Sequence, residues 1–339
     1  GEPKTSVWGI VSRWLIPLLI SAAAFWLVFR EVDLNQFIQN LSKIGAGTII
    51  LASLLYFVSL FLRVFCWYVL LRRRVSFKDA FFTMSAGYLL NNLFPFRLGE
   101  IGRGVLLGDP HGPTVFEVLS SVLVERIFDI FLAAVFVLAM LPRVLGGSFD
   151  RTLILIALFL AVGGLAVLYL LARYRERVTD WMLKWGQRSD FVKQWVVPKV
   201  AQVLEGLSVL NDPRAFIIAF GSLFLSWFVA FGQNFVIFRS LYPAPPFWWM
   251  IFILSAGAFG AALPSAPAGL GVFEGVIVAA FAFLNVNADL ALTHAIVVHL
   301  IAFVYANILG LIGLRMRGQA VVDLYRRVVH RRPEIQTIE

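Results

Sequence analysis

The sequence predicts an all-α polytopic membrane protein with six transmembrane helices and two oppositely inserted re-entrant helical hairpins, arranged as an inverted repeat. Three observations predict this fold. Hydrophobic residues make up 60% of the 339 residues and charged residues only 14%, whereas a soluble domain has about 25% charged residues. Basic residues cluster at the ends of apolar segments, and two interrupted apolar segments resemble one another 170 positions apart. We therefore expect a single transmembrane domain over residues 1–339.

The spanning segments follow from length and hydropathy. A transmembrane helix needs roughly 20 mainly apolar residues, and six stretches reach that length. They are Trp8–Phe29, Ala46–Leu71, Val115–Leu141, Leu153–Ala172, Ala215–Phe238 and Leu290–Leu314. Two amphipathic stretches, Leu34–Ile44 and Val200–Leu210, are expected between the first and second spans of each half.

Basic residues set the expected orientation. A triple arginine, Arg72–Arg74, follows the second span, seven Lys or Arg lie between residues 173 and 199, and six lie between residues 315 and 332. Because cytoplasmic loops are enriched in Lys and Arg, we expect these regions and both termini to be cytoplasmic. This pattern also accounts for the net charge of +9, so nucleic acid is not an expected partner.

Two of these basic regions are expected to lie on the membrane surface. Residues 173–213 alternate aromatic and basic side chains, which is typical of an interfacial segment on anionic headgroups. Residues 315–339 form a similar basic tail. A contact with a partner protein is the alternative for both segments.

The orientation leaves two segments that must enter and leave the membrane on one side. Residues 76–114 would do so from the cytoplasm, and residues 247–284 from outside, which makes each a re-entrant hairpin. The halves, about 1–145 and 150–316, then form an inverted repeat with a two-fold axis in the membrane plane. The alternative is a pair of ordinary tilted spans, although roughly 15 residues on either side of each break fall short of the membrane thickness.

Proline and glycine interrupt both hairpins at corresponding places, near Pro95 and Pro264. A shift of 170 positions superimposes the residues around the two breaks. The matched residues are Ser85, Ala86, Gly87, Leu93 and Gly99 in the first hairpin and Ser255, Ala256, Gly257, Leu263 and Gly269 in the second. A doubled pair of interrupted apolar segments indicates a transporter-type site near the bilayer midplane.

The first hairpin carries charges after its break. Arg97, Glu100 and Arg103 follow Pro95 at helical spacing and are expected near one face. Ionisable side chains in membrane segments are costly and mark candidate sites. We predict that Arg97 and Arg103 bind a phosphate, because a guanidinium group matches phosphate bidentately.

The third span contains four further charges, at Glu117, Glu125, Arg126 and Asp129. Glu125 and Asp129 share one side of the helix, and Arg126 points about a quarter-turn away. Carboxylates and arginines on neighbouring elements can neutralise one another. A static ion-pair cluster that holds the hairpin against this span is therefore as well supported as a substrate-facing role.

Polar residues also lie at the breaks. Asn91 and Asn92 either offer donors to a substrate or satisfy the interrupted backbone. Half-helices that start after Pro95 and near Gly271 would present free N–H groups, which bind anions. Glu274 follows the second break and either caps its own helix or serves as a proton- or cation-coupling carboxylate.

Other motifs argue against an enzyme. The segment Gly269–Gly275 resembles a dinucleotide loop, but its last glycine is one position late and no βαβ unit surrounds it. His294 and His299 are five positions apart and point to different sides, so no shared metal is expected. We predict no catalytic residue, metal or cofactor. Arg63 in the second span and Gln233 in the fifth are expected to line a cavity, unless Arg63 reaches toward the triple arginine.

Three ordered segments resemble the lysylphosphatidylglycerol synthase transmembrane (flippase-like) family. Residues 91–103, NNLFPFRLGEIGR, look like its N-x-L-P-x-R-x-G-E-x-x-R stretch, with Phe94 inserted before Pro95. Residues 124–129, VERIFD, resemble its E-R-hydrophobic-x-D segment. Leu263-Pro264 and residues 269–275, GLGVFEG, resemble its L-P…G-x-G-x-x-E-G segment.

The resemblance implies a bacterial or archaeal cytoplasmic-membrane protein that moves an anionic or amphiphilic phospho- or glycolipid. The family is related to the membrane half of the multiple peptide resistance factor, whose separate synthase domain has no counterpart in this sequence. A membrane lipid is the expected partner, and lipid-biosynthesis enzymes and a homodimer stay open. A membrane enzyme that transfers a group onto a lipid phosphate, and a scaffold for lipid synthesis, are the alternatives.

Overall fold

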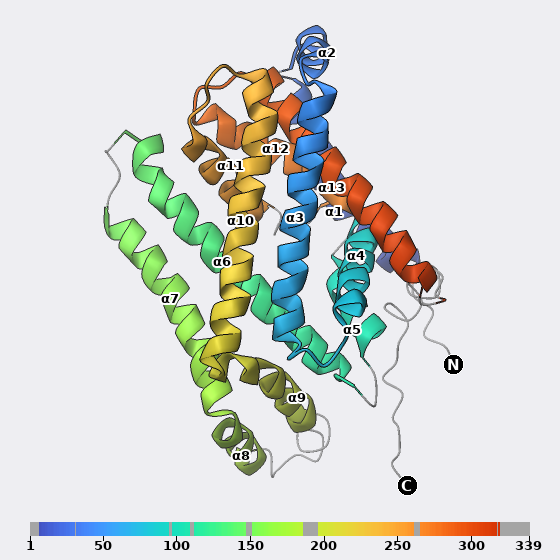
Figure 1. The fold of residues 1–339 in the computed structure, drawn as a ribbon, viewed down its shortest axis with the longest axis vertical. Coiled ribbons are helices and arrows are strands. Elements are labelled where there is room, and N and C mark those ends of the chain that lie inside the picture. Colours follow the sequence, from blue (N-terminus) through green and yellow to red (C-terminus); the bar gives the residue numbers. More distant parts are fainter. Residues whose placement is uncertain are drawn as a thin grey trace.

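The structure is a computed structural model that describes residues 7–30, 32–94, 97–108, 112–146, 151–185, 196–260, 265–316 and 318. Within these ranges it contains helices and no strand (Figure 1). The expected breaks at Pro95 and Pro264 lie outside the described residues. So do residues 186–195 of the interfacial segment and most of the basic tail.

Six long helices occupy the stretches that were predicted as spans. They are α1 (Val7–Phe29), α3 (Ala46–Leu70), α6 (Val115–Val144), α7 (Arg151–Arg173), α10 (Pro213–Leu241) and α13 (Ala288–Met316). Every predicted boundary lies within three residues of the observed one. Among the described residues, α3, α10 and α13 are long and apolar enough to cross a membrane. The all-helical class is therefore confirmed, and the count of six spans stays a prediction.

Shorter helices complete the fold. They are α2 (Leu34–Ser42), α4 (Phe77–Leu93), α5 (Leu98–Leu107), α8 (Arg175–Trp185), α9 (Val197–Leu207), α11 (Phe247–Gly260) and α12 (Val272–Ala282). Two 3-10 turns, η3 (Ser208–Asn211) and η4 (Pro267–Gly269), follow α9 and precede α12. At 1.5 Å per residue, α5 and α12 are each about 15–17 Å long, roughly half the hydrocarbon thickness. Figure 1 shows α4 and α5 in the lower half of the view and α11 and α12 in the upper half.

Local sequence explains where several helices begin. The Ser76 hydroxyl accepts from the Asp79 N–H at 3.0 Å and caps α4. Thr114 and Glu117 form a reciprocal capping box at the start of α6. Asp212 accepts from the Arg214 N–H at 2.9 Å, and Pro213 opens α10. Each cap satisfies a backbone donor that the first helical turn leaves without a partner.

Helices α3 and α10 cross at the centre of the molecule. The Ser59 hydroxyl lies 3.0 Å from the Ser226 carbonyl oxygen, and the Ser226 hydroxyl lies 2.9 Å from the Ser59 carbonyl oxygen. Around this pair, α4 packs against α13 and α11 packs against α6. Gly310 and Gly313 permit the α4–α13 contact, because a Cβ at Gly310 would lie 2.8 Å from the Ser85 carbonyl oxygen.

The interfacial segment is partly packed on the protein. Leu204 and Leu207 of α9 are buried, and the Ser120 hydroxyl of α6 donates to the Val203 carbonyl at 2.8 Å. Helix α9 therefore contacts α6 directly, whereas the surface position expected for the whole segment stays a prediction.

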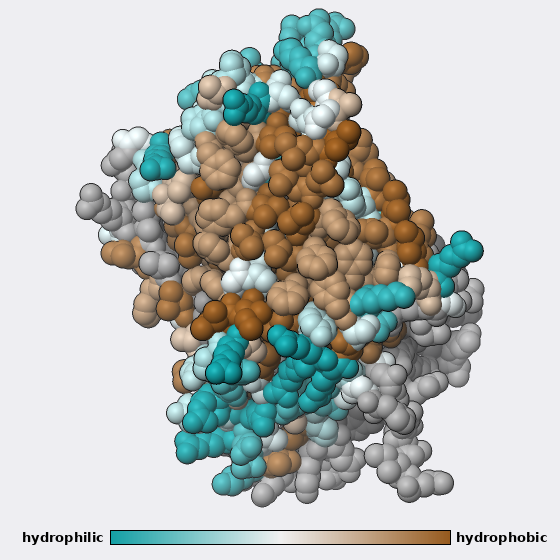
Figure 2. Space-filling view, viewed as in Figure 1, coloured by the Kyte–Doolittle hydropathy of each residue, from teal (hydrophilic) through white to brown (hydrophobic). Residues whose placement is uncertain are grey.

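The outer surface is apolar across its middle. Figure 2 shows a broad hydrophobic region between hydrophilic ends. Large exposed apolar side chains on α3, α10 and α13 include Leu54, Phe61, Ile217, Leu225, Leu300 and Leu311. Such a continuous apolar surface is far larger than a soluble monomer presents, so it agrees with a helical membrane protein.

Candidate functional site

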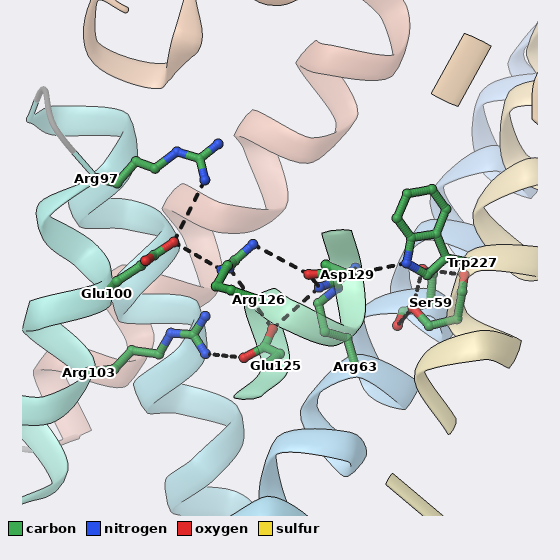
Figure 3. Close-up of polar contacts among 10 residues, drawn as sticks. Ser59, Arg63, Arg97, Glu100, Arg103, Glu125, Arg126, Asp129 and Trp227 are labelled. Atoms are coloured by element: carbon green, nitrogen blue, oxygen red, sulfur yellow. Dashed lines mark hydrogen bonds and ion pairs between the residues drawn. The ribbon is translucent and has the colours of Figure 1, made fainter. Parts of the chain in front are cut away.

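Charged side chains from three helices form one network (Figure 3). Its members are Arg63 of α3, Arg97 before α5, Glu100 and Arg103 of α5, and Glu125, Arg126 and Asp129 of α6. The structure thus brings together the six charged residues predicted for the site in the first half, and it joins to them Arg63, which was expected to line a cavity. With all groups ionised, four guanidinium groups face three carboxylates and leave one positive charge in excess.

The centre of the network is fully buried. Glu125 has no exposed side-chain surface and lies 2.7 Å from Arg103 Nη1 and 3.3 Å from Arg63 Nη1. The guanidinium of Arg103 is only 1% exposed and lies 4.9 Å from the Trp67 ring centre. Its Nη2 has no hydrogen-bond partner among the described residues. Removing either ionic partner would leave a buried charge without compensation, so this pair holds α5 against α6.

Asp129 connects α6 to both central helices. Arg63 binds it with two nitrogens, at 2.5 and 2.9 Å. The Trp227 indole N–H of α10 donates to the same carboxylate at 3.1 Å. The structure therefore places Arg63 in the ion-pair network, and not extended toward the triple arginine.

The network becomes exposed at its other end. Arg126 was expected to point away from the two acids, but its long side chain reaches Glu100 at 3.0 Å and Asp129 at 3.4 Å. Arg97 lies 3.8 Å from Glu100 and is 43% exposed. The backbone of Arg97 has a φ of +52° at the start of α5, which is uncommon for a residue other than glycine. The guanidinium of Arg97 is thus the most exposed of the four.

Asn91 closes the first hairpin. Its side-chain oxygen accepts from the Gly99 N–H at 2.8 Å, so it satisfies backbone at the interruption. A Cβ at Gly99 would lie 1.8 Å from the Gly87 carbonyl oxygen. Helices α4 and α5 therefore touch backbone to backbone, and a substrate contact by Asn91 stays a prediction.

A cavity of about 360 Å³ lies beside the network, between α3, α4, α10, α13 and η4. Polar side chains line it from several elements. They are Tyr56, Ser59, Arg63, Tyr88, Asn91, Asn92, Gln233, Asn234 and His299. The buried amide nitrogens of Asn92 and Gln233 have no hydrogen-bond partner among the described residues. An amide nitrogen can only donate, so these two cavity-lining side chains carry donors whose partner would be an acceptor-rich group.

Glu274 lies beside His299, which lines this cavity, and makes two contacts. Its Oε2 accepts from the Gly271 N–H at 2.7 Å and caps α12. Its Oε1 lies 2.6 Å from His299 Nδ1, and His299 Nε2 lies 3.0 Å from the Ala268 carbonyl oxygen. The capping role is thus observed, and the coupling role stays a prediction. Arg63 of the charged network and His299, the partner of Glu274, both line the cavity.

Sequence reasoning expected Arg63 to line a cavity but missed its ion pairs, and it gave Trp227 and His299 no role in the site. A signal for two of them was present, since an arginine and a histidine inside apolar spans need buried partners. The partners are 62 to 66 positions away for Arg63 and 25 positions away for His299. No helical spacing links such pairs, and only the packing of the helices shows them.

Comparisons with known proteins cover both halves of the chain. Residues 14–310 match the family model described as the lysylphosphatidylglycerol synthase TM region. A UPF0104 membrane protein of Methanothermobacter thermautotrophicus is 23% identical over 270 residues, which cover 73% of this chain and 76% of that relative.

Proposed function

The chain belongs to the lysylphosphatidylglycerol synthase TM region family, and from this premise we propose that it moves an anionic or amphiphilic lipid across a bacterial or archaeal cytoplasmic membrane. The observation that carries the proposal is the central cavity. Polar side chains, among them Arg63, Asn92 and Gln233, line about 360 Å³ of space inside helices whose outer surfaces are apolar. A lipid fits both the polar cavity and the apolar outer surface, because its headgroup accepts hydrogen bonds and its tails stay in the bilayer.

The packing of the helices supports an inverted repeat with re-entrant hairpins. Helix α4 of the first half packs on α13 of the second, and α11 of the second packs on α6 of the first. In the same way, α2 packs on α13 and α9 on α6. Helices α3 and α10 pair with one another at the centre. These matched contacts are those that a two-fold axis through the α3–α10 crossing would generate, and such an axis is typical of alternating-access transporters.

The network gives the two ends of a headgroup path different properties. Arg97 is 43% exposed, so a phosphate can reach its guanidinium without displacing a buried carboxylate. Arg63 faces the cavity and is held by Asp129. Arg103 must leave Glu125 before it can bind a phosphate, so we assign it a positioning role and Arg97 the first contact.

Lipid movement in proteoliposomes tests the proposal. A fluorescent anionic phospholipid in one leaflet is quenched from outside, and the rate at which label becomes protected or accessible is measured. Arg97→Ala and Arg63→Ala are each expected to slow the movement about tenfold or more, since each loses charge-assisted hydrogen bonds. Arg63→Lys keeps the charge but loses the bidentate pair with Asp129, so an intermediate rate is expected.

Arg175→Gln is the matched control, because Arg175 is an exposed arginine that pairs with Glu205 away from the cavity. Wild-type rates in both alanine variants would contradict the assignment of the path. Mass spectrometry of lipids recovered from the same vesicles separates transport from chemistry: a lipid of new mass would show an enzyme in place of a transporter.

A further inference from the structure

We propose that Glu274 and His299 form a proton-binding site on the cavity wall, and that this proton binds and leaves together with an anionic headgroup. The coupling part of this proposal rests on the proposed function, and the proton site itself does not. Glu274 is 4% exposed and His299 is 13% exposed at the side chain. The pair is therefore shielded from bulk solvent, while His299 lines the cavity.

The hydrogen-bond partners of His299 fix the number of protons. Its Nε2 faces the Ala268 carbonyl oxygen at 3.0 Å, which can only accept, so this nitrogen carries a hydrogen. Its Nδ1 lies 2.6 Å from Glu274 Oε1. One more hydrogen must lie between these two atoms, on the ring or on the carboxyl, because two lone pairs would otherwise face each other. The pair as it stands is therefore protonated and has no net charge.

Loss of that proton would change the contact. A neutral ring has one hydrogen and cannot donate from both nitrogens. Held on Nδ1 by the ionised carboxylate, that hydrogen leaves Nε2 and the Ala268 carbonyl oxygen as two acceptors 3.0 Å apart. The segment that precedes α12 would then be released. His299 holds its Ala268 carbonyl, and Ala268 adopts an unfavourable φ of +61°. Protonation thus fixes the turn that borders the cavity.

Few other titratable groups face the pair. From α3, Arg63 and Tyr56 line the same cavity, and from α4, Tyr88 does so. Helix α10 contributes only uncharged amides to the cavity wall, and the Phe273 ring lies 4.9 Å from the His299 ring. On α13, His294 is bound to Asn234. Helix α11, and the part of α1 whose side chains are described, have no ionisable residue beside α12.

This arrangement couples the proton to an anion. The positive charge of Arg63 favours the deprotonated pair, which carries one negative charge. An anionic headgroup in the cavity opposes Arg63, so it favours the protonated pair. Because coupling is reciprocal, proton binding then strengthens headgroup binding. In the cycle, a hydronium ion in the cavity transfers a proton to the pair: its O–H bond breaks and an N–H or O–H bond forms. That bond breaks when the headgroup leaves, and the proton returns to water on the other side as hydronium.

Spectroscopy tests the proton site without transport. Protein labelled with ¹⁵N-histidine is reconstituted in bilayers at neutral pH, and ring nitrogen spectra are recorded with infrared spectra of the carboxyl groups. A doubly protonated ring or a protonated carboxyl is expected, and it should disappear in both His299→Gln and Glu274→Gln. His294→Gln is the matched control and should remove only the signal of a neutral ring. A neutral His299 ring beside an ionised Glu274 would overturn the proposal.

Vesicles test the coupling. Proteoliposomes of phosphatidylglycerol and phosphatidylcholine carry a trapped pH-sensitive dye, and lipid movement is measured with and without an inward proton gradient. The gradient is expected to change the wild-type rate about fivefold or more, with internal acidification that requires phosphatidylglycerol. His299→Gln keeps donors for Glu274 and Ala268 but cannot exchange the proton, so both responses should vanish.

The two hypotheses fail in different ways. A wild-type rate that moves lipid but ignores the gradient would overturn the coupling and leave the proposed function intact. A wild type that moves no lipid would overturn the proposed function, and the spectra would still decide whether the pair binds the proton.

Discussion

The two short helix pairs occupy matching places in the sequence but are built differently. In α4–α5, Gly99 touches Gly87 backbone to backbone, and Glu100 and Arg103 join a network of seven charged groups. In α11–α12, a Cβ at Gly257 would meet only the end of the Ile277 side chain, at 2.9 Å. Glu274 is the only ionisable residue of those two helices. The first pair therefore contributes two members of an ion-pair network, whereas the second contributes one carboxylate that pairs with His299 of α13.

The largest effect is expected at the buried centre of the first pair. Glu125→Gln removes the charge that compensates Arg103, whose side chain is 1% exposed. Breaking a buried ion pair on one side costs about 3–5 kcal/mol, so the thermal midpoint of the detergent-purified protein should fall steeply. A variant as stable as the wild type would show that Arg103 finds water or another partner.

Glu205→Gln is the control for that variant. Glu205 pairs with Arg72 at 2.9 Å and with Arg175 at 2.8 Å, but its side chain is 37% exposed. Exposed ion pairs contribute about 0–1 kcal/mol. The thermal midpoint of Glu205→Gln should therefore lie close to that of the wild type. The small difference that remains should depend on the salt concentration, in contrast to the large loss in Glu125→Gln.

Alanine at the two glycines compares the hairpin contacts directly. Gly99→Ala would place a Cβ 1.8 Å from the Gly87 carbonyl oxygen, and backbone atoms cannot move aside cheaply. A loss of about 1–3 kcal/mol or more is expected from such overpacking. Gly257→Ala meets a flexible methyl group, and we expect it to cost less than about 1 kcal/mol. Equal losses in urea or thermal unfolding would contradict the difference drawn between the pairs.

The smallest effect is expected where the halves meet. Ser59→Ala and Ser226→Ala each remove one hydroxyl donor from the reciprocal pair. Hydrogen bonds between membrane helices contribute about 0.6 kcal/mol on average. The two hydroxyl oxygens also lie 2.9 Å apart, so a double-mutant cycle should give a coupling energy of up to that size between the two sites. Strictly additive losses would show that this contact contributes nothing.

Hydropathy and charge predicted much of the fold. The six long helices follow runs of apolar residues, so their boundaries could be placed within three residues. The positions of Glu100, Arg103, Glu125 and Asp129 in apolar segments also marked them as a group. Local spacing indicates which side chains share a helix face, and this was enough to group Glu100 with Arg103 and Glu125 with Asp129.

The partners across helices could not be predicted in the same way. Arg63 binds Asp129 because of the rotation of α3 relative to α6, and the sequence carries no periodic signal for that angle. The contacts of Arg126 could not be predicted from its quarter-turn offset for a similar reason. A quarter-turn describes the Cβ direction, whereas a long guanidinium side chain can bend back to reach Glu100 and Asp129.

The crossing of α3 and α10 has a mechanical consequence. Each serine hydroxyl there bonds to the carbonyl of the other helix, so in the proposed transport cycle a rocking motion about that point would keep both bonds intact. A disulfide engineered between positions 59 and 226 should consequently leave such a pivot free to work. A disulfide between α4 and α13, away from the α3–α10 crossing, should hold the two halves in one relative arrangement.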